Sequence, residues 1–195
     1  MENNNFEEIK STYDKYIALL RKFFADSGDA VDKLESEIGE RLFLAPRDTH
    51  PQQGGIPGGI VSFSLDVAKC AKNLGDMVDA KKLVRIALLH ELGKLGGPES
   101  GQDLFLPEDS SWHREKLGKA YKFNEFCPKM STAHRTLFYV ARYGFQLDEE
   151  EWVAIVTSSG FQYDENRFYA NEILPLAQSL QICRTFALSK MKGAA

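Results

Sequence analysis

Residues 88–97 read LLHELGKLGG, an apolar run that carries a histidine and a glutamate and then stops on glycines. The apolar residues before this stretch recur three or four positions apart, which predicts an amphipathic helix from about residue 79 to residue 93. Glu91 falls on the apolar face of that helix. Because a buried carboxylate is costly unless it is paired, His90 and Glu91 predict a metal site, a buried ion pair or the remains of a metal site.

Helical periodicity extends over most of the chain. The predicted helices cover residues 6–24, 31–38, 60–74, 79–93, 131–144, 147–159 and 171–189. Gly144 is expected to end one helix, and Asp148 and Glu151 form a capping box at the start of the next. Pro175 is expected either in the first turn of the last helix or at a kink within it. Strand patterns are weak. The sequence therefore predicts an all-α bundle of about seven or eight helices in one domain spanning residues 1–195.

Composition narrows the range of functions. The net charge of -4 argues against general nucleic-acid binding, which a basic protein would favour. No apolar run approaches the roughly 18 residues that a membrane span needs, and the polar amino terminus does not read as a secretory signal. The three cysteines are far apart, which favours free thiols over a disulfide framework or a cysteine zinc site. We therefore expect a cytoplasmic protein with no membrane partner.

Several blocks of the sequence resemble the HD-domain metal-dependent phosphohydrolases. These blocks are ALLHELGK (87–94), GGIVSFSLDVAKCA (58–71), SWHREKLGKAY (111–121), TAHRTLFYVARYGFQLDEEEWVAI (132–155) and LPLAQSLQICR (174–184). The later blocks are most similar to small, often phage-borne members of the family. The resemblance implies a helical HD-like core over residues 45–188, onto which the helices of residues 1–44 pack. It also implies a divalent metal and phosphoryl chemistry.

The chain departs from the family at most of the implied metal ligands. The family's first histidine falls on Phe63, the aspartate of the HD pair on Glu91, and the final aspartate on Gln178. The position near residues 157–158, where another histidine is implied, holds threonine and serine. Only His90 is unchanged. Two ligands make a poor transition-metal site, which normally needs at least three, so the comparison predicts a degenerate metal centre.

Other polar residues offer alternatives at this site. Lys94 and two His-Arg pairs, His113 with Arg114 and His134 with Arg135, could form a phosphate-binding pocket, since arginine is suited to bidentate phosphate contact. In the other interpretation, the arginines pair with Glu91 or with surface carboxylates and the histidines are structural. A buried Glu91 without a metal needs another cation, and Arg114, Arg135 and Lys94 are the candidates.

A third possibility is a rebuilt metal site, in which His113 and His134 join His90 and Glu91 around manganese, zinc or iron. Sequence spacing alone leaves open whether these four side chains meet.

These observations lead to three functional hypotheses. The first is a degenerate HD-type protein that needs no metal cofactor and binds a nucleotide, a nucleic-acid end or a protein partner. The second is an active metal-dependent phosphohydrolase that acts on a nucleotide or phosphate ester through the rearranged His/Glu site. The third is an interaction module, which could be a homo-oligomer through the apolar face of its first helix. Whether the chain is an enzyme stays open at the level of sequence.

Overall fold

The computed structural model describes residues 2–74 and 78–193, and within these residues the all-α prediction is confirmed. The helices are α1 (Glu2–Phe23), α2 (Ala30–Leu44), α3 (Gly59–Asn73), α4 (Ala80–Leu89), α5 (Ser111–Leu117), α6 (Thr132–Tyr143), α7 (Glu149–Val156) and α8 (Pro175–Gly193). Short 3-10 turns are η1 (Ala25–Ser27), η2 (Pro51–Gln53), η3 (Leu92–Leu95), η4 (Thr157–Ser159) and η5 (Asp164–Asn171).

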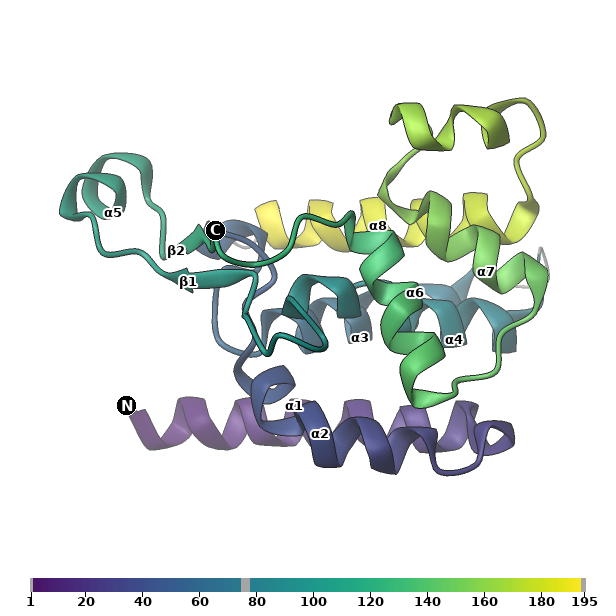
Figure 1. The fold of residues 1–195 in the computed structure, drawn as a ribbon, viewed down its shortest axis with the longest axis horizontal. Coiled ribbons are helices and arrows are strands. Elements are labelled where there is room, and N and C mark those ends of the chain that lie inside the picture. The colour runs from purple at the N-terminus through teal and green to yellow at the C-terminus, as the bar shows by residue number, and fades with distance from the viewer. Residues whose placement is uncertain (1, 75–77, 194–195) are drawn as a thin grey trace.

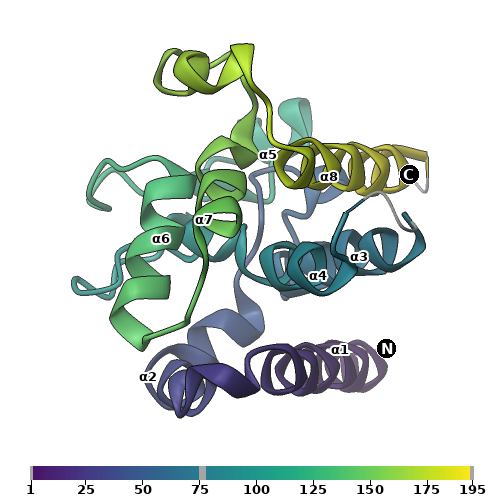
Figure 2. The same ribbon diagram turned by 90° about the vertical axis from the view of Figure 1, so that its right-hand side faces the viewer.

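Helices α3 and α4 form the centre of the molecule. Figures 1 and 2 show α1 and α2 on one side of this pair, α8 on the other, and α6 and α7 beside it. Every residue of α4 from Leu83 to Leu89 is buried, because neighbours cover it on all sides. The first helix contributes Tyr16, Ile17 and Leu20 to the core, so its apolar face packs onto the bundle.

The predicted end of α6 and the predicted start of α7 are confirmed, whereas α8 begins four residues after its predicted start at residue 171. Gly144 follows α6 with a φ of 82°, a conformation that glycine adopts without strain. Asp148 accepts a hydrogen bond from the Glu151 amide, and the Glu151 side chain accepts one from the Asp148 amide, which completes the capping box. Pro175 is the first residue of α8.

Helix α4 ends at Leu89, four residues before the predicted end at Gly93. The chain turns at His90 and Glu91 and continues as η3. A Cβ on Gly93 would lie 2.0 Å from the Thr132 carbonyl oxygen, so only a glycine lets this turn approach α6 so closely. The Gly93 amide donates to Thr136 Oγ1 at 2.9 Å. Packing against α6, which the local pattern does not encode, therefore sets the end of α4.

Two short strands were missed in the sequence. Strands β1 (Phe105–Pro107) and β2 (Tyr121–Phe123) pair antiparallel and bracket α5, forming an arm of residues 105–123 that projects beyond the helices (Figure 1). Strands of three residues are too short for an alternating pattern to be visible. The amides of Ala120 and Tyr121 donate to the Thr49 carbonyl and so attach the arm to the loop after α2.

Among the described residues, no helix is both long enough and apolar enough to cross a membrane.

Candidate functional site

The carboxylate of Glu91 is buried at the turn between α4 and η3 and contacts three cations. Arg184 Nη2 lies 3.0 Å from Oε1, and Lys94 Nζ and Arg47 Nε each lie 3.2 Å from Oε2. Glu91 itself is only 1% exposed. Burial alone would raise the pKa of this carboxyl, but Lys94, Arg47 and Arg184 together hold the pKa well below its usual value. We call these four residues, with His90, the Glu91 cluster.

Arg47 enters the cluster from the loop between α2 and η2. Its guanidinium carbon lies 3.8 Å from the centroid of the Phe63 ring on α3, a cation–π contact, and Nη1 donates to the Gln53 carbonyl at 2.9 Å. The Arg47 side chain is 5% exposed and Phe63 is fully buried. Phe63 therefore supports a cation at the position where the family resemblance implies a metal-binding histidine.

Arg184 enters from α8, on the opposite side of Glu91. Besides the carboxylate, it donates from Nη1 to the Ser158 carbonyl in η4. The neighbouring Gln181 donates from Nε2 to the Thr157 carbonyl at 3.0 Å. These contacts join the last helix to the segment in which the resemblance implies another metal-binding histidine.

His90 lies beside this ion pair with its ring fully buried. Its Nδ1 is 2.8 Å from the Ala87 carbonyl oxygen, which can only accept, so Nδ1 carries the proton. Its Nε2 has no hydrogen-bond partner among the described residues and lies 3.6 Å from Glu91 Oε1. Burial, reinforced by Arg184 and Arg47, lowers the pKa of His90 to about 3 against the opposing effect of Glu91, so the imidazole is neutral.

Most of the positions at which the family resemblance implies metal ligands lie close to His90 and Glu91. Phe63 lies 6.0 Å from the His90 ring, and the residues at 157–158 contact α8 beside Glu91. Gln178 is different, because it is exposed on α8 and does not contact the cluster. The inward face of α8 near the site carries Gln181 and Arg184 instead.

The two predicted His-Arg pairs lie elsewhere. His113 Nδ1 is 3.2 Å from Glu108 Oε2, and Arg114 donates to the Glu108 carbonyl. Both residues therefore make their contacts within the arm. Arg135 is buried and donates to the Gly93 and Pro128 carbonyls, while His134 is exposed on α6. The structure therefore brings neither pair to Glu91.

Of the three cations expected to neutralise Glu91, only Lys94 contacts it. Sequence reasoning missed Arg47 and Arg184, which lie 44 and 93 residues from Glu91 along the chain. Arg184 did carry a weak signal, since it continues the helical spacing of buried Ala177 and Leu180. Arg47 lies in a loop, where no periodicity marks a buried side chain.

The residues present do not fit a divalent metal ion. His90 Nε2 and the Glu91 carboxylate are suitable metal ligands. Three cationic side chains already surround the carboxylate, however, and they would repel a metal cation. Among the described residues no three His, Cys, Asp or Glu side chains form a group that could hold a metal, so His113 and His134 do not complete the set.

A hollow of about 450 Å³ leads from the surface to Lys94. Its walls come from the end of α2, from η3 and from the arm, with Pro46, Phe105 and Tyr121 among them. The Lys94 side chain is 15% exposed, so it links the buried cluster to this hollow.

Comparison of the chain with protein-family models, with curated proteins and with solved structures gave no match. Function is therefore argued from the geometry of the site.

Proposed function

We propose that this chain is a non-catalytic, HD-like helical protein that binds a nucleotide-sized phosphorylated ligand beside Lys94. The observation that carries this proposal is the Glu91 cluster, in which arginine and lysine side chains surround the carboxylate of the HD-like pair. The order of the sequence blocks and the convergence of Phe63, His90 and Glu91 support the relationship to HD-domain proteins.

The charges of the cluster favour an anionic ligand. Three cations face one carboxylate, which leaves positive charge in excess around Glu91, although burial lowers the pKa of Lys94. Buried charge of one sign is stabilised by an ion of the other sign. Lys94 is the member that reaches the 450 Å³ hollow, a volume suited to a small organic ligand. Two acids, Glu40 and Asp103, also line the hollow, and Asp103 is paired with Arg41 at 2.9 Å.

The same arrangement disfavours hydrolysis. A metal-dependent phosphohydrolase needs an ion that polarises the phosphate ester and generates hydroxide. Around Glu91, the position that such an ion would occupy is next to Arg47 and Arg184. These side chains can bind a phosphate but cannot supply hydroxide.

Calorimetric titration with inorganic phosphate, AMP and ATP tests the binding role. We expect binding that the Lys94→Gln variant weakens about tenfold, the effect of losing one charge-assisted hydrogen bond. Lys116→Gln is the matched control, because Lys116 is exposed on α5 away from the hollow. Equal affinity in both variants, or no binding of any of the three compounds, would contradict the proposal.

One observation favours the second candidate, an active phosphohydrolase with a rearranged site. His90 Nε2 is unprotonated and has no partner among the described residues, as a metal ligand requires. Turnover of p-nitrophenyl phosphate with added Mn²⁺, lost in the His90→Ala variant, would establish this activity and overturn the non-catalytic role. We expect no such turnover.

A further inference from the structure

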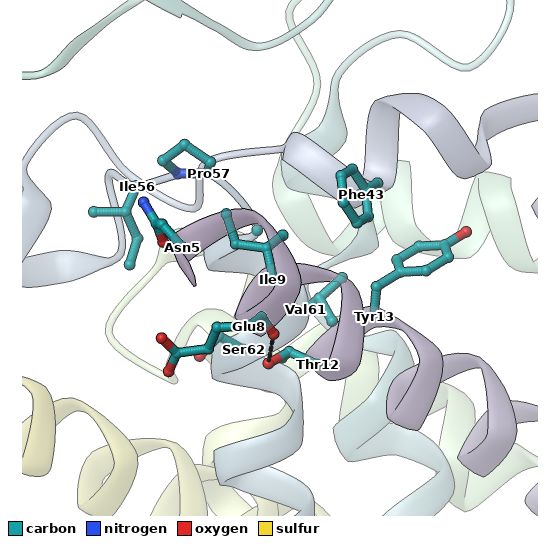
Figure 3. A pocket seen from close by; sticks show the side chains of 11 residues that line it. Asn5, Glu8, Ile9, Thr12, Tyr13, Phe43, Ile56, Pro57, Val61 and Ser62 are labelled. Atoms are coloured by element: carbon teal, nitrogen blue, oxygen red, sulfur yellow. Dashed lines mark hydrogen bonds between the residues drawn. The ribbon is translucent and has the colours of Figure 1, made fainter. Parts of the chain in front are cut away.

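Two adjoining hollows lie on the face formed by α1, the end of α2 and the start of α3, away from the Glu91 cluster. The first has a volume of about 300 Å³ and lies between α1, Phe43 and the turn before α3 (Figure 3). The second has a volume of about 500 Å³ and lies along α2. Tyr13 and Phe43 line both, so they form one continuous surface, which we call the acidic hollow.

The walls of the acidic hollow are apolar and aromatic. Figure 3 shows Ile9, Pro57 and Val61 around the first part, with Phe43 and Tyr13 at its edge. The Tyr13 and Phe43 rings meet edge to face with their centroids 5.5 Å apart. The aliphatic part of a lysine or arginine side chain can pack against the faces of such rings, and its charge can make a cation–π contact.

All charged residues that line the acidic hollow are acidic. Glu8 lines the first part, and Glu35 and Glu40 line the second. Arg21 pairs with Glu35 at 2.8 Å, whereas no cation among the described residues lies within ion-pairing distance of Glu8 or Glu40. Burial, with Glu35 and Asp14 adding negative charge, raises the pKa of Tyr13 to about 12, so the phenol stays neutral and adds no charge.

We propose that the acidic hollow binds a basic segment of a partner protein. A lysine or arginine of that segment extends over Tyr13 and Phe43 and places its charge near Glu8, while a flanking apolar residue contacts Ile9 and Val61. Charge complementarity selects this occupant, since an anionic ligand would be repelled and an apolar one would leave the unpaired carboxylates without a counter-charge. The proposal is independent of the phosphate-binding role, because Glu8, Ile9 and Tyr13, on which it rests, do not line the hollow beside Lys94.

A peptide titration followed by amide chemical shifts of the full-length, ¹⁵N-labelled protein tests this proposal. The probe is a blocked hexapeptide of glycine, leucine, lysine, arginine, leucine and glycine, and its neutral counterpart has glutamine at both basic positions. We expect the basic peptide to shift the amides of α1, Phe43, Ile56 and Gly58, with weaker effects at high salt. The neutral peptide should leave these amides unchanged.

Two variants and a control complete the design. Glu8→Gln and Tyr13→Leu should each weaken binding of the basic peptide about threefold or more, the loss of one exposed charge or aromatic contact. Glu7→Gln is the matched control, because Glu7 is the adjacent acid on α1 but does not line the hollow. Glu40 is unsuitable because it also borders the hollow beside Lys94.

Four outcomes overturn the proposal. The first three are equal binding of both peptides, equal weakening by Glu7→Gln and Glu8→Gln, and shifts confined to other parts of the chain. A concentration-dependent rise in molecular mass that broadens the same amides would assign the surface to a second copy of the chain, and would also overturn it. Unchanged far-ultraviolet circular dichroism of each variant shows that the fold is intact.

Discussion

Glu91 carries its charge in a place that water does not reach. Its stabilisation depends on Arg47, Lys94 and Arg184, and their own burial is in turn compensated by Glu91 and by backbone carbonyls. Removal of one member of such a group leaves the others uncompensated, which costs more than the net contribution of the ion pair. Single substitutions in the cluster should therefore have large effects on stability.

We expect the Glu91→Gln variant to lose about 3–5 kcal/mol of unfolding free energy, because three cations would face a neutral amide in a buried site. Urea denaturation monitored by circular dichroism measures this loss. Glu115→Gln is the matched control, since Glu115 is exposed on α5, and it should change the unfolding free energy by less than about 0.5 kcal/mol. Similar losses in the two variants would contradict the burial argument.

His90 predicts a pH dependence of stability. Its pKa falls from 6.5 in the unfolded chain to about 3 in the folded protein, so between these values only the unfolded state binds the proton. Stability from this residue is therefore lost as pH falls below 6.5, with a slope that approaches about 1.4 kcal/mol per pH unit. Above pH 4.5 the carboxyl of Glu91 is largely ionised in both states and adds little slope.

Urea midpoints at pH 5.0 and pH 6.5 should therefore differ less in the His90→Gln variant than in the unchanged protein. The comparison cancels the contribution of titrating groups that do not interact with His90. An unaltered difference between the two midpoints would show that His90 is not held neutral by burial.

At the scale of elements, the sequence predicted most helices but not their packing. Periodicity located α3 and α7, and the glycine and capping signals placed the end of α6 and the start of α7 correctly, because these signals act within a few residues. The end of α4 was misplaced because it depends on contact with α6, and Arg47 and Arg184 were missed because they reach Glu91 across the fold. Lys94 was found because it lies three residues from Glu91 on the same turn.

Gly93 is where η3 and α6 come closest. A Cβ there would lie 2.0 Å from the Thr132 carbonyl oxygen, and a backbone atom cannot rotate away. We expect Gly93→Ala to cost about 2–3 kcal/mol of stability, the upper part of the range for overpacking. Gly118→Ala should cost only about 1 kcal/mol, because it introduces a strained φ of 64° but meets open space. Thermal unfolding of both variants compares the two costs.

At the scale of the whole molecule, Arg85 joins segments that are distant in sequence. From α4 it contacts Glu151 on α7 at 2.6 Å and Asp26 in η1 at 2.9 Å, and it donates to the Gln146 carbonyl before α7. Its guanidinium also lies 4.3 Å from the Phe24 ring centroid. This residue therefore couples the first helices and α7 to the central helix.

The Arg85→Met variant should lose about 3–5 kcal/mol of stability, because the buried Glu151 would lose its charge partner. Burial already raises the pKa of Glu151, and Arg85 opposes that effect. The double variant Arg85→Met/Glu151→Gln should be more stable than Arg85→Met alone, since a neutral amide needs no counter-charge and can still complete the capping box. A further loss in the double variant, measured by urea denaturation, would rule out this coupling.

The guanidinium of Arg47 over Phe63 has a consequence for how the protein depends on its surroundings. A bound ion exchanges with the solvent, so its occupancy follows supply and falls when a chelator competes for it. The positive charges at Glu91 belong to side chains of the protein, so they do not depend on the concentration of any ion in the solvent. The charge of Glu91 is therefore balanced whatever ions the solvent contains.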